Sequence, residues 1–104
     1  MARKIITQDS VNAFMAGRPF CRSNMSVSLS PRGDCWQLAL HGNVIAERYR
    51  FPLVDGTALR VTNAGWASNT TKERLNGIPG VSVVQRNFTW YLNGKEWDGS
   101  WTTV

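Results

Sequence analysis

The sequence has no long hydrophobic run, only one histidine and only two cysteines among its 104 residues. No apolar stretch approaches the ~18–20 residues that are needed to span a bilayer. The first residues, MARKIITQDSV, also lack the uninterrupted apolar segment of a signal peptide. Cys21 and Cys35 do not have zinc-ligand spacing, and His41 alone cannot complete a set of metal ligands. We therefore expect an intracellular protein with free thiols and without a structural metal, a cofactor or a membrane partner.

Motifs of the common enzyme classes are also missing. There is no phosphate-binding glycine loop, no Gly-x-Ser-x-Gly nucleophile elbow and no dense cluster of carboxylates. Cys35 and His41 mark the two ends of one expected strand, about 20 Å apart at ~3.3 Å per residue, which excludes a dyad within that strand. Glu96 and Asp98 share one strand face and are interpreted either as a carboxylate pair or as solvated side chains. We expect a protein that is not an enzyme.

What the sequence does have is a basic balance. Its 12 lysines and arginines outnumber its 7 aspartates and glutamates, which gives a formal net charge of +5. Such a balance favours anionic partners, among them nucleic acid, nucleotides and acidic protein surfaces. The hydrophobic content of 42% and the charged content of 18% are typical of a soluble globule. A chain of this length is expected to form a single domain, residues 1–104, with one core.

Hydrophobic periodicity and turn residues predict two helices and six strands. The first helix is expected from an N-cap at Thr7 to Ala16, where Gly17 suits the C-terminal cap. The second is expected over 70–76, because Thr70 and Glu73 form a capping box. The strands are expected over 25–30, 35–40, 44–50, 57–62, 81–85 and 88–92. The order α-β-β-β-β-α-β-β predicts an α+β domain with an antiparallel sheet of about six strands.

The turn near His41 is compatible with two strand registers. A two-residue turn at Gly42-Asn43 places Ile45 on the apolar face of the preceding strand. A three-residue loop over 41–43 places Val44 and Ala46 on that face instead. Both registers remain open from the sequence alone.

Asn93-Gly94 is the clearest turn, because both residues accept the positive φ of a type I′ turn. Closing a hairpin there, and turning the preceding one at Arg86-Asn87, pairs Val83 with Trp90. Strand alternation then places four apolar side chains on one face: Phe88, Trp90, Leu92 and Trp97. We expect that face to belong to the core and Tyr91 to lie on the opposite, mostly polar face.

The predicted binding surface consists of cations on the middle strands and on the second helix, with one aromatic residue for stacking. Its members are Arg48, Arg50, Arg60, Lys72, Arg74 and Tyr91. Free N–H groups of Thr71 and Lys72 at the start of the helix also suit a phosphate oxygen. The competing interpretation is a solvated face on which the charges are scattered.

Three phrases together resemble a group of short proteins that tailed bacteriophages encode, for which no activity is established. They are HGNVIA at 41–46, GW at 65–66 with TTKERLN at 70–76, and WYLNG at 90–94 with WDG at 97–99. The resemblance covers most of residues 36–99. It implies a small accessory protein made in the cytoplasm of an infected bacterial cell, and it transfers no catalytic or binding residues.

The leading hypothesis is therefore a non-enzymatic phage accessory protein that binds an anionic partner, most plausibly single-stranded or duplex nucleic acid. One alternative is a protein-interaction module that inhibits a host enzyme or a defence system, with Trp66 or Trp101 as its anchor. Another is a protein that sequesters a small nucleotide signal. The sequence leaves the oligomeric state open.

Overall fold

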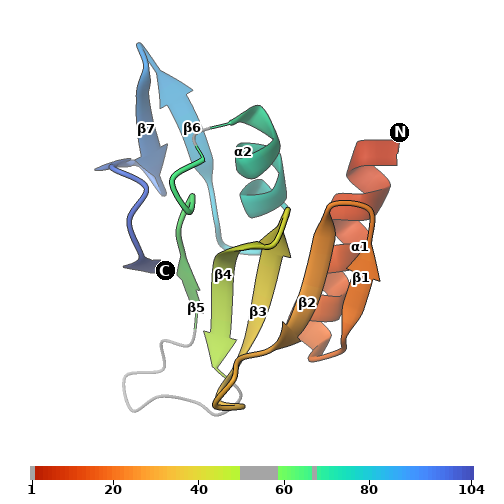
Figure 1. Ribbon diagram of the computed structural model, residues 1–104. Helices are drawn as coiled ribbons and strands as arrows, with labels where there is room; N and C mark the ends of the chain where they lie inside the picture. Colours follow the sequence, from red (N-terminus) through yellow and green to blue (C-terminus); the bar gives the residue numbers. More distant parts are fainter. Residues whose placement is uncertain (1, 50–58, 67) are drawn as a thin grey trace.

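The computed structural model describes residues 2–49, 59–66 and 68–104, with side chains from residue 6 onward (Figure 1). The elements are α1 (Ala2–Ala16), β1 (Phe20–Arg22), β2 (Met25–Leu29), β3 (Cys35–Leu40), β4 (Asn43–Tyr49), β5 (Leu59–Val61), α2 (Asn69–Asn76), β6 (Val83–Arg86), β7 (Thr89–Leu92), β8 (Lys95–Trp97) and β9 (Thr102–Thr103). The last residue of the expected strand 44–50 and the first two residues of the expected strand 57–62 lie outside the described residues.

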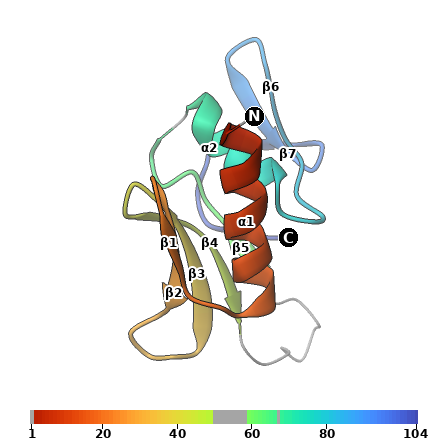
Figure 2. The same ribbon diagram turned by 90° about the vertical axis from the view of Figure 1, so that its right-hand side faces the viewer.

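The structure confirms an antiparallel α+β fold, but the described strands form two sheets. The larger sheet has the order β1-β2-β3-β4-β5-β9, and the smaller has the order β6-β7-β8. The helix α1 packs against β1, β2 and β3 on one face of the larger sheet, and α2 contacts both β4 and β6 (Figures 1 and 2). The sequence does not predict β1 or β9, which are only three and two residues long.

The core lies where both helices meet the larger sheet. Phe14 of α1, Leu38 of β3, Ala46 of β4, Val61 of β5 and Leu75 of α2 are all fully buried. Burial of each large apolar side chain contributes roughly 1.5–3 kcal/mol, so these contacts hold α2 and α1 to the sheet. No helix within the described ranges combines the length and the apolar character that crossing a membrane requires.

The first helix begins earlier than the sequence predicts. It starts at Ala2, so Thr7 is an interior residue and the prediction of an N-cap there is wrong. The Thr7 side chain is buried and its hydroxyl donates a 3.1 Å hydrogen bond to Glu73 Oε1 of α2, a partner 66 residues away. The C-terminal prediction is confirmed, because Gly17 has a φ of 71° and Arg18 N donates to Ala13 O at 2.9 Å, as in a Schellman motif.

The β3–β4 hairpin follows neither of the two expected registers. Its turn is His41-Gly42, where both residues have positive φ as a type I′ turn requires. The register then shifts at a bulge between Leu38 and Ala39, so that Leu38 pairs with Ala46. A bulge places two residues of one strand opposite one of the other, which explains why both Ile45 and Ala46 are buried.

The second helix is capped by Ser68 rather than by Thr70. Ser68 has extended backbone angles, and its Oγ accepts a 3.2 Å hydrogen bond from Thr71 N. The prediction of a capping box at Thr70 and Glu73 is therefore wrong. The cap therefore lies two residues earlier than expected. With this start of the helix, Thr71 is buried against the core and the Glu73 carboxylate reaches Thr7 of α1.

The small sheet confirms three of the four predicted core residues. Trp90, Leu92 and Trp97 are buried, and the two indole rings lie 6.2 Å apart between centroids. Phe88 is instead 95% exposed at the tip of the β6–β7 hairpin, with a φ of 68°. The turn is Asn87-Phe88, so the expected turn at Arg86-Asn87 is wrong.

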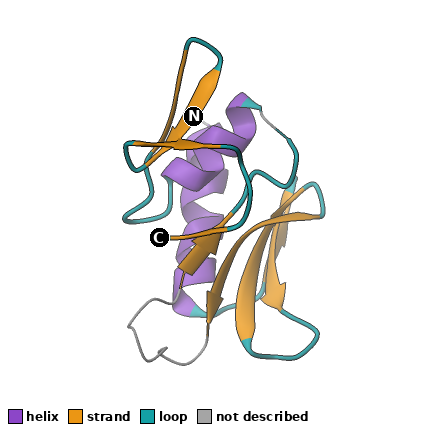
Figure 3. Cartoon of the chain, turned by 90° about the vertical axis from the view of Figure 1, so that its left-hand side faces the viewer, coloured by secondary structure: helices purple, strands orange, loops and turns teal. Residues whose placement is uncertain are grey.

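Side-chain amides fix that register. The Asn76 side chain of α2 donates from Nδ2 to Val83 O at 2.9 Å and accepts at Oδ1 from Val83 N at 2.7 Å. These two hydrogen bonds satisfy the backbone groups of Val83 on the outer edge of β6. Asn93 likewise accepts from Ser82 N at 2.7 Å. Val83 consequently pairs with Leu92 rather than with Trp90. The hairpin β6–β7 is thereby held at its base, while its tip projects beyond the helices (Figure 3).

Candidate functional site

Arg74, a residue of the predicted binding surface, lies in the interior. Its side chain is 97% buried, and its Nη1 donates to Thr7 Oγ1 at 2.6 Å and to Glu73 Oε1 at 2.8 Å. Its Nη2 also lies 3.4 Å from Asn24 Oδ1 in the β1–β2 turn. The guanidinium thus ties α2 to α1 and to the first hairpin, and it does not face a partner.

Arg48 and Arg60 lie on opposite faces of the larger sheet. Arg48 pairs with Trp36 on the α1 side, and its Nε donates a 3.1 Å hydrogen bond to Phe14 O near the end of α1. Arg60 pairs with Glu47 on the other face and forms a salt bridge with its carboxylate. This bond raises the pKa of the Arg60 guanidinium. Arg50 lies outside the described residues. The two arginines of the middle strands that the structure does place, Arg48 and Arg60, do not share a surface.

Arg60 also stacks on aromatic rings. Its guanidinium carbon lies 4.9 Å from the centroid of Trp101 and 6.0 Å from that of Tyr49. Trp101 retains 41% exposure above this contact. Because Glu47 neutralises the cation, the cluster is an ion pair flanked by aromatics rather than a phosphate site.

The remaining predicted residues, Lys72 and Tyr91, lie at the β6–β7 hairpin together with Arg86. Lys72 Nζ donates to Gln85 Oε1 at 2.8 Å and lies 5.5 Å above the Trp90 ring. Arg86 lies 5.9 Å from the Tyr91 ring centroid. Because Trp90 and Tyr91 alternate along β7, the two cations occupy opposite faces of the hairpin.

The two strands of this hairpin carry no aspartate or glutamate. Glu73 of α2 is paired with Arg74, and Glu96 of β8 is the cross-strand partner of Tyr91, on the face that Arg86 occupies. We call residues 83–92 together with Lys72 the basic hairpin. Arg86 is the member that the sequence analysis missed, because it was expected to be a turn residue.

The predicted phosphate site at the start of α2 is not available as expected. Thr71 N donates to Ser68 Oγ, and Lys72 N donates to Ser68 O at 3.1 Å. Both amides are therefore used within the capped helix. The shift of the cap from Thr70 to Ser68 is the physical reason for this difference.

A cleft with an aromatic wall lies between the β3–β4 turn and the residues that precede α2. Its volume is about 290 Å³, and Leu40 and Ile45 form its apolar floor. Trp66 forms a wall and remains 61% exposed. We call this the aromatic cleft. None of its lining residues is an aspartate, glutamate, lysine or arginine, and its rim consists of His41, Asn43, Asn63, Ser68 and Thr70.

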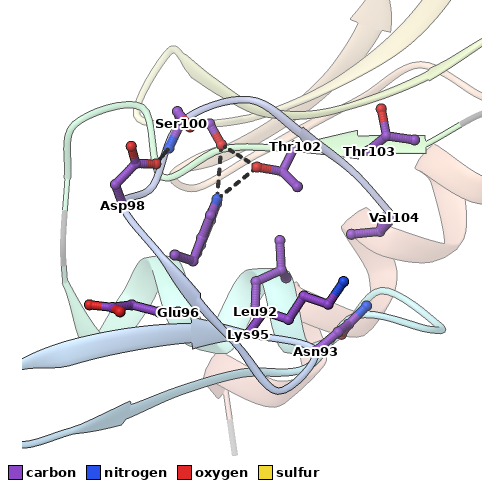
Figure 4. A pocket seen from close by; sticks show the side chains of 10 residues that line it. Leu92, Asn93, Lys95, Glu96, Asp98, Ser100, Thr102, Thr103 and Val104 are labelled. Atoms are coloured by element: carbon purple, nitrogen blue, oxygen red, sulfur yellow. Dashed lines mark hydrogen bonds between the residues drawn. The ribbon is translucent and has the colours of Figure 1, made fainter.

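A larger and more open depression, of about 660 Å³, lies between β8 and β9 (Figure 4). The indole Nε1 of Trp97 donates to Ser100 O at 2.9 Å and to Thr102 Oγ1 at 3.0 Å, which closes its floor. The Asp98 carboxylate accepts from Ser100 N at 3.0 Å, and hydrogen bonding to Ser100 lowers its pKa. A carboxyl of lowered pKa stays ionised near neutral pH, so Asp98 is poorly suited to act as a general acid with Glu96.

The cysteines offer no activated nucleophile. Cys21 is exposed and Cys35 is buried, and both are free thiols. Burial raises the pKa of the Cys35 thiol, which makes the reactive thiolate rarer. The neighbouring Arg32-Gly33-Asp34 sequence forms a turn, in which Gly33 has a φ of 73° and Gly33 N donates to Ser30 O at 2.8 Å. The described residues contain no group of three or more metal-binding side chains.

The comparisons with known proteins place the chain in a phage family. The model of the family described as Kyanoviridae Gp96 protein matches residues 2–103, which is nearly the whole chain. No curated protein and no solved structure matches it. The resemblance to phage proteins that the sequence phrases indicate is confirmed at this level. The chain belongs to the Kyanoviridae Gp96 protein family.

Proposed function

We propose that this phage protein is a non-enzymatic accessory protein that binds nucleic acid through the basic hairpin. The observation that carries the proposal is the placement of two cations, Lys72 of α2 and Arg86 of β6, on opposite sides of the hairpin β6–β7, whose strands carry no carboxylate. Arg48, Arg60 and Arg74 each form a hydrogen bond or a salt bridge with another part of the fold, so the proposal does not rest on them.

The geometry of the hairpin suits a duplex. The end of the hairpin from Arg86 to Thr89 extends beyond β8, and a two-stranded β-ribbon of this kind fits the major groove, which is about 12 Å wide. Arg86 and Lys72 of α2 flank this end on opposite sides, so insertion brings both cations near phosphates, and each neutralised phosphate releases counterions. Tyr91 lies under Arg86, so it supports the guanidinium and has less free surface for base stacking than the sequence suggested.

The test is the salt dependence of binding, measured by fluorescence anisotropy with labelled duplex DNA, single-stranded DNA and RNA. The wild type should bind at low salt, with an affinity that falls as salt rises. The double variant Lys72→Ala/Arg86→Ala should reduce the slope of log affinity against log salt by about 1.8, because each lost phosphate contact removes ~0.9.

The matched control is Arg18→Ala/Arg32→Ala, which removes the same charge from two exposed connections outside the hairpin. It should leave most of the slope in place. The proposal fails if the wild type does not bind at low salt, or if the control lowers the slope as much as the hairpin variant does.

A second candidate function is docking on a host protein, because Trp66 is a largely exposed aromatic residue beside an apolar floor. Aromatic residues at the centre of an interface supply much of its binding energy. Capture from nuclease-treated host lysate tests this candidate. A specific host protein should be retained by the wild type and by Trp101→Ala, and lost with Trp66→Ala. Equal retention by all three proteins excludes the aromatic cleft as the anchor.

A further inference from the structure

The tip of the β6–β7 hairpin carries an aromatic ring at a position where glycine would fit better. Asn87 and Phe88 are the two central residues of the turn, with φ values of 49° and 68°, and the Phe88 side chain is 95% exposed. A two-residue turn with positive φ at both positions favours Asn-Gly, because a bulky residue is strained there. A ring that is almost fully exposed and strains its own turn is an outlier of the kind found at binding sites.

The tip is long enough to reach the floor of a DNA groove. β8 pairs with β7 only as far as Trp90, so the hairpin continues beyond the small sheet by the Arg86–Thr89 pair and the two turn residues. These two steps span about 7 Å at ~3.3 Å per residue, and the aromatic side chain extends further. The major groove is about 8.5 Å deep and admits a two-stranded β-ribbon. A hairpin inserted there brings the Phe88 ring to the edges of the base pairs.

The side chains at the tip match the major-groove edge of an A·T base pair. Thymine presents its C5-methyl group there, which an apolar side chain such as phenylalanine contacts. Adenine presents the N7 acceptor and the N6 amino donor, which the amide of an asparagine binds with two hydrogen bonds. Asn87 is exposed beside Phe88, so one tip carries both kinds of side chain. Guanine presents two acceptors and cytosine has no methyl group, so a G·C pair satisfies neither.

We propose that Phe88 contacts the thymine methyl group, and Asn87 the adenine, of A·T pairs in the major groove of duplex DNA. Lys72 and Arg86 then supply the phosphate contacts, while the tip sets the sequence preference. The inference rests on the proposed function and names its substrate as B-form DNA. Double-stranded RNA should bind less tightly, because side chains cannot read its deep and narrow major groove and its uracil lacks the methyl group.

Fluorescence anisotropy at low salt tests the inference with two labelled duplexes of one sequence, the second with deoxyuridine in place of thymidine. This exchange removes only the C5-methyl groups. The wild type should bind the thymidine duplex about 4-fold more tightly, as expected for one methyl-sized group removed from water. Phe88→Gly, which suits the turn, should bind both duplexes equally. Val84→Ala is the matched control, because it removes an exposed apolar side chain of the same hairpin away from the tip, and it should keep the preference.

Asn87→Gly tests the adenine contact in the same assay, since glycine also accepts positive φ. This variant should lose about 5–150-fold of the preference for the thymidine duplex over a duplex of G·C pairs alone, which is the range for one bidentate contact to a base. It should keep the preference for thymidine over deoxyuridine. An unchanged preference for A·T over G·C pairs in Asn87→Gly overturns the role of Asn87.

The outcomes separate this inference from the proposed function. Equal affinity of the wild type for both A·T duplexes or for double-stranded RNA, or a thymidine preference that persists in Phe88→Gly, overturns the inference, whereas salt-dependent binding still supports the proposed function. Equal affinity for both A·T duplexes is also the result expected if the ring stacks between base pairs instead of contacting their edges. A wild type that binds no duplex at low salt overturns both. The wild-type comparison needs no variant, so it decides even where circular dichroism shows a variant to be unfolded.

Discussion

Replacing Phe88 by glycine should make the fold more stable, although it deletes a large apolar side chain. The ring is 95% exposed, so its removal takes almost no buried surface out of the folded state. The left-handed backbone at φ 68° costs a non-glycine residue about 1–2 kcal/mol. Glycine avoids this cost, but it also makes the unfolded chain more flexible, which lowers the free energy of unfolding by about 0.5–1 kcal/mol. The net expectation is a gain of about 0.5–1 kcal/mol.

Urea denaturation of the wild type and of Phe88→Gly measures this difference. Phe88→Ala is the matched control, because alanine loses the ring but keeps the strained backbone, and it should stay within about 0.5 kcal/mol of its parent. A gain of about 1 kcal/mol raises Tm by about 4–8 °C in a domain of this size. Destabilisation by glycine would show that the ring packs against the fold. An equal gain with alanine would show that backbone strain is not the cause.

Four further predictions concern the fold and its thiols. Arg74→Ala should lower the free energy of unfolding by about 2–4 kcal/mol in a denaturant titration, because it leaves buried partners without their hydrogen bonds; a loss below 1 kcal/mol would contradict the bridging role. Ser68→Ala should cost about 1 kcal/mol while Thr70→Ala costs little, and the reverse order would restore the cap that the sequence predicts. Cys21 should be alkylated by iodoacetamide much faster than Cys35, as mass spectrometry of timed samples would show. Burial raises the pKa of the Cys35 thiol in the folded protein, so as pH rises above ~8.5 the thiol ionises first in the unfolded chain. The contribution of Cys35 to the free energy of unfolding should therefore be present below that pH and decline above it, as urea titrations at a series of pH values would show.

Local rules in the sequence determined the class of the fold. Strand alternation placed Trp90, Leu92 and Trp97 on one buried face, and this survived an error in the preceding turn. A shift of pairing by two residues keeps every side chain on its own side of the sheet, because the alternation has a period of two. The turn at Asn93-Gly94 and the cap at Gly17 were equally readable, since positive φ is a requirement of single residues.

The tertiary structure alone decided which polar residues are buried and which remain on the surface. Arg74 is as basic in the sequence as Lys72, but Thr7, 67 residues away, and Asn24, 50 residues away, draw it into the interior. Arg48 and Arg60 are separated by the register of β4 against β5, which no local pattern specifies. The exposure of Phe88 at the tip of β6–β7 likewise follows from the turn at Asn87-Phe88, whereas strand alternation predicted a core residue. Hydrophobic periodicity is local and therefore legible in the sequence, whereas the surface a partner meets depends on long-range packing.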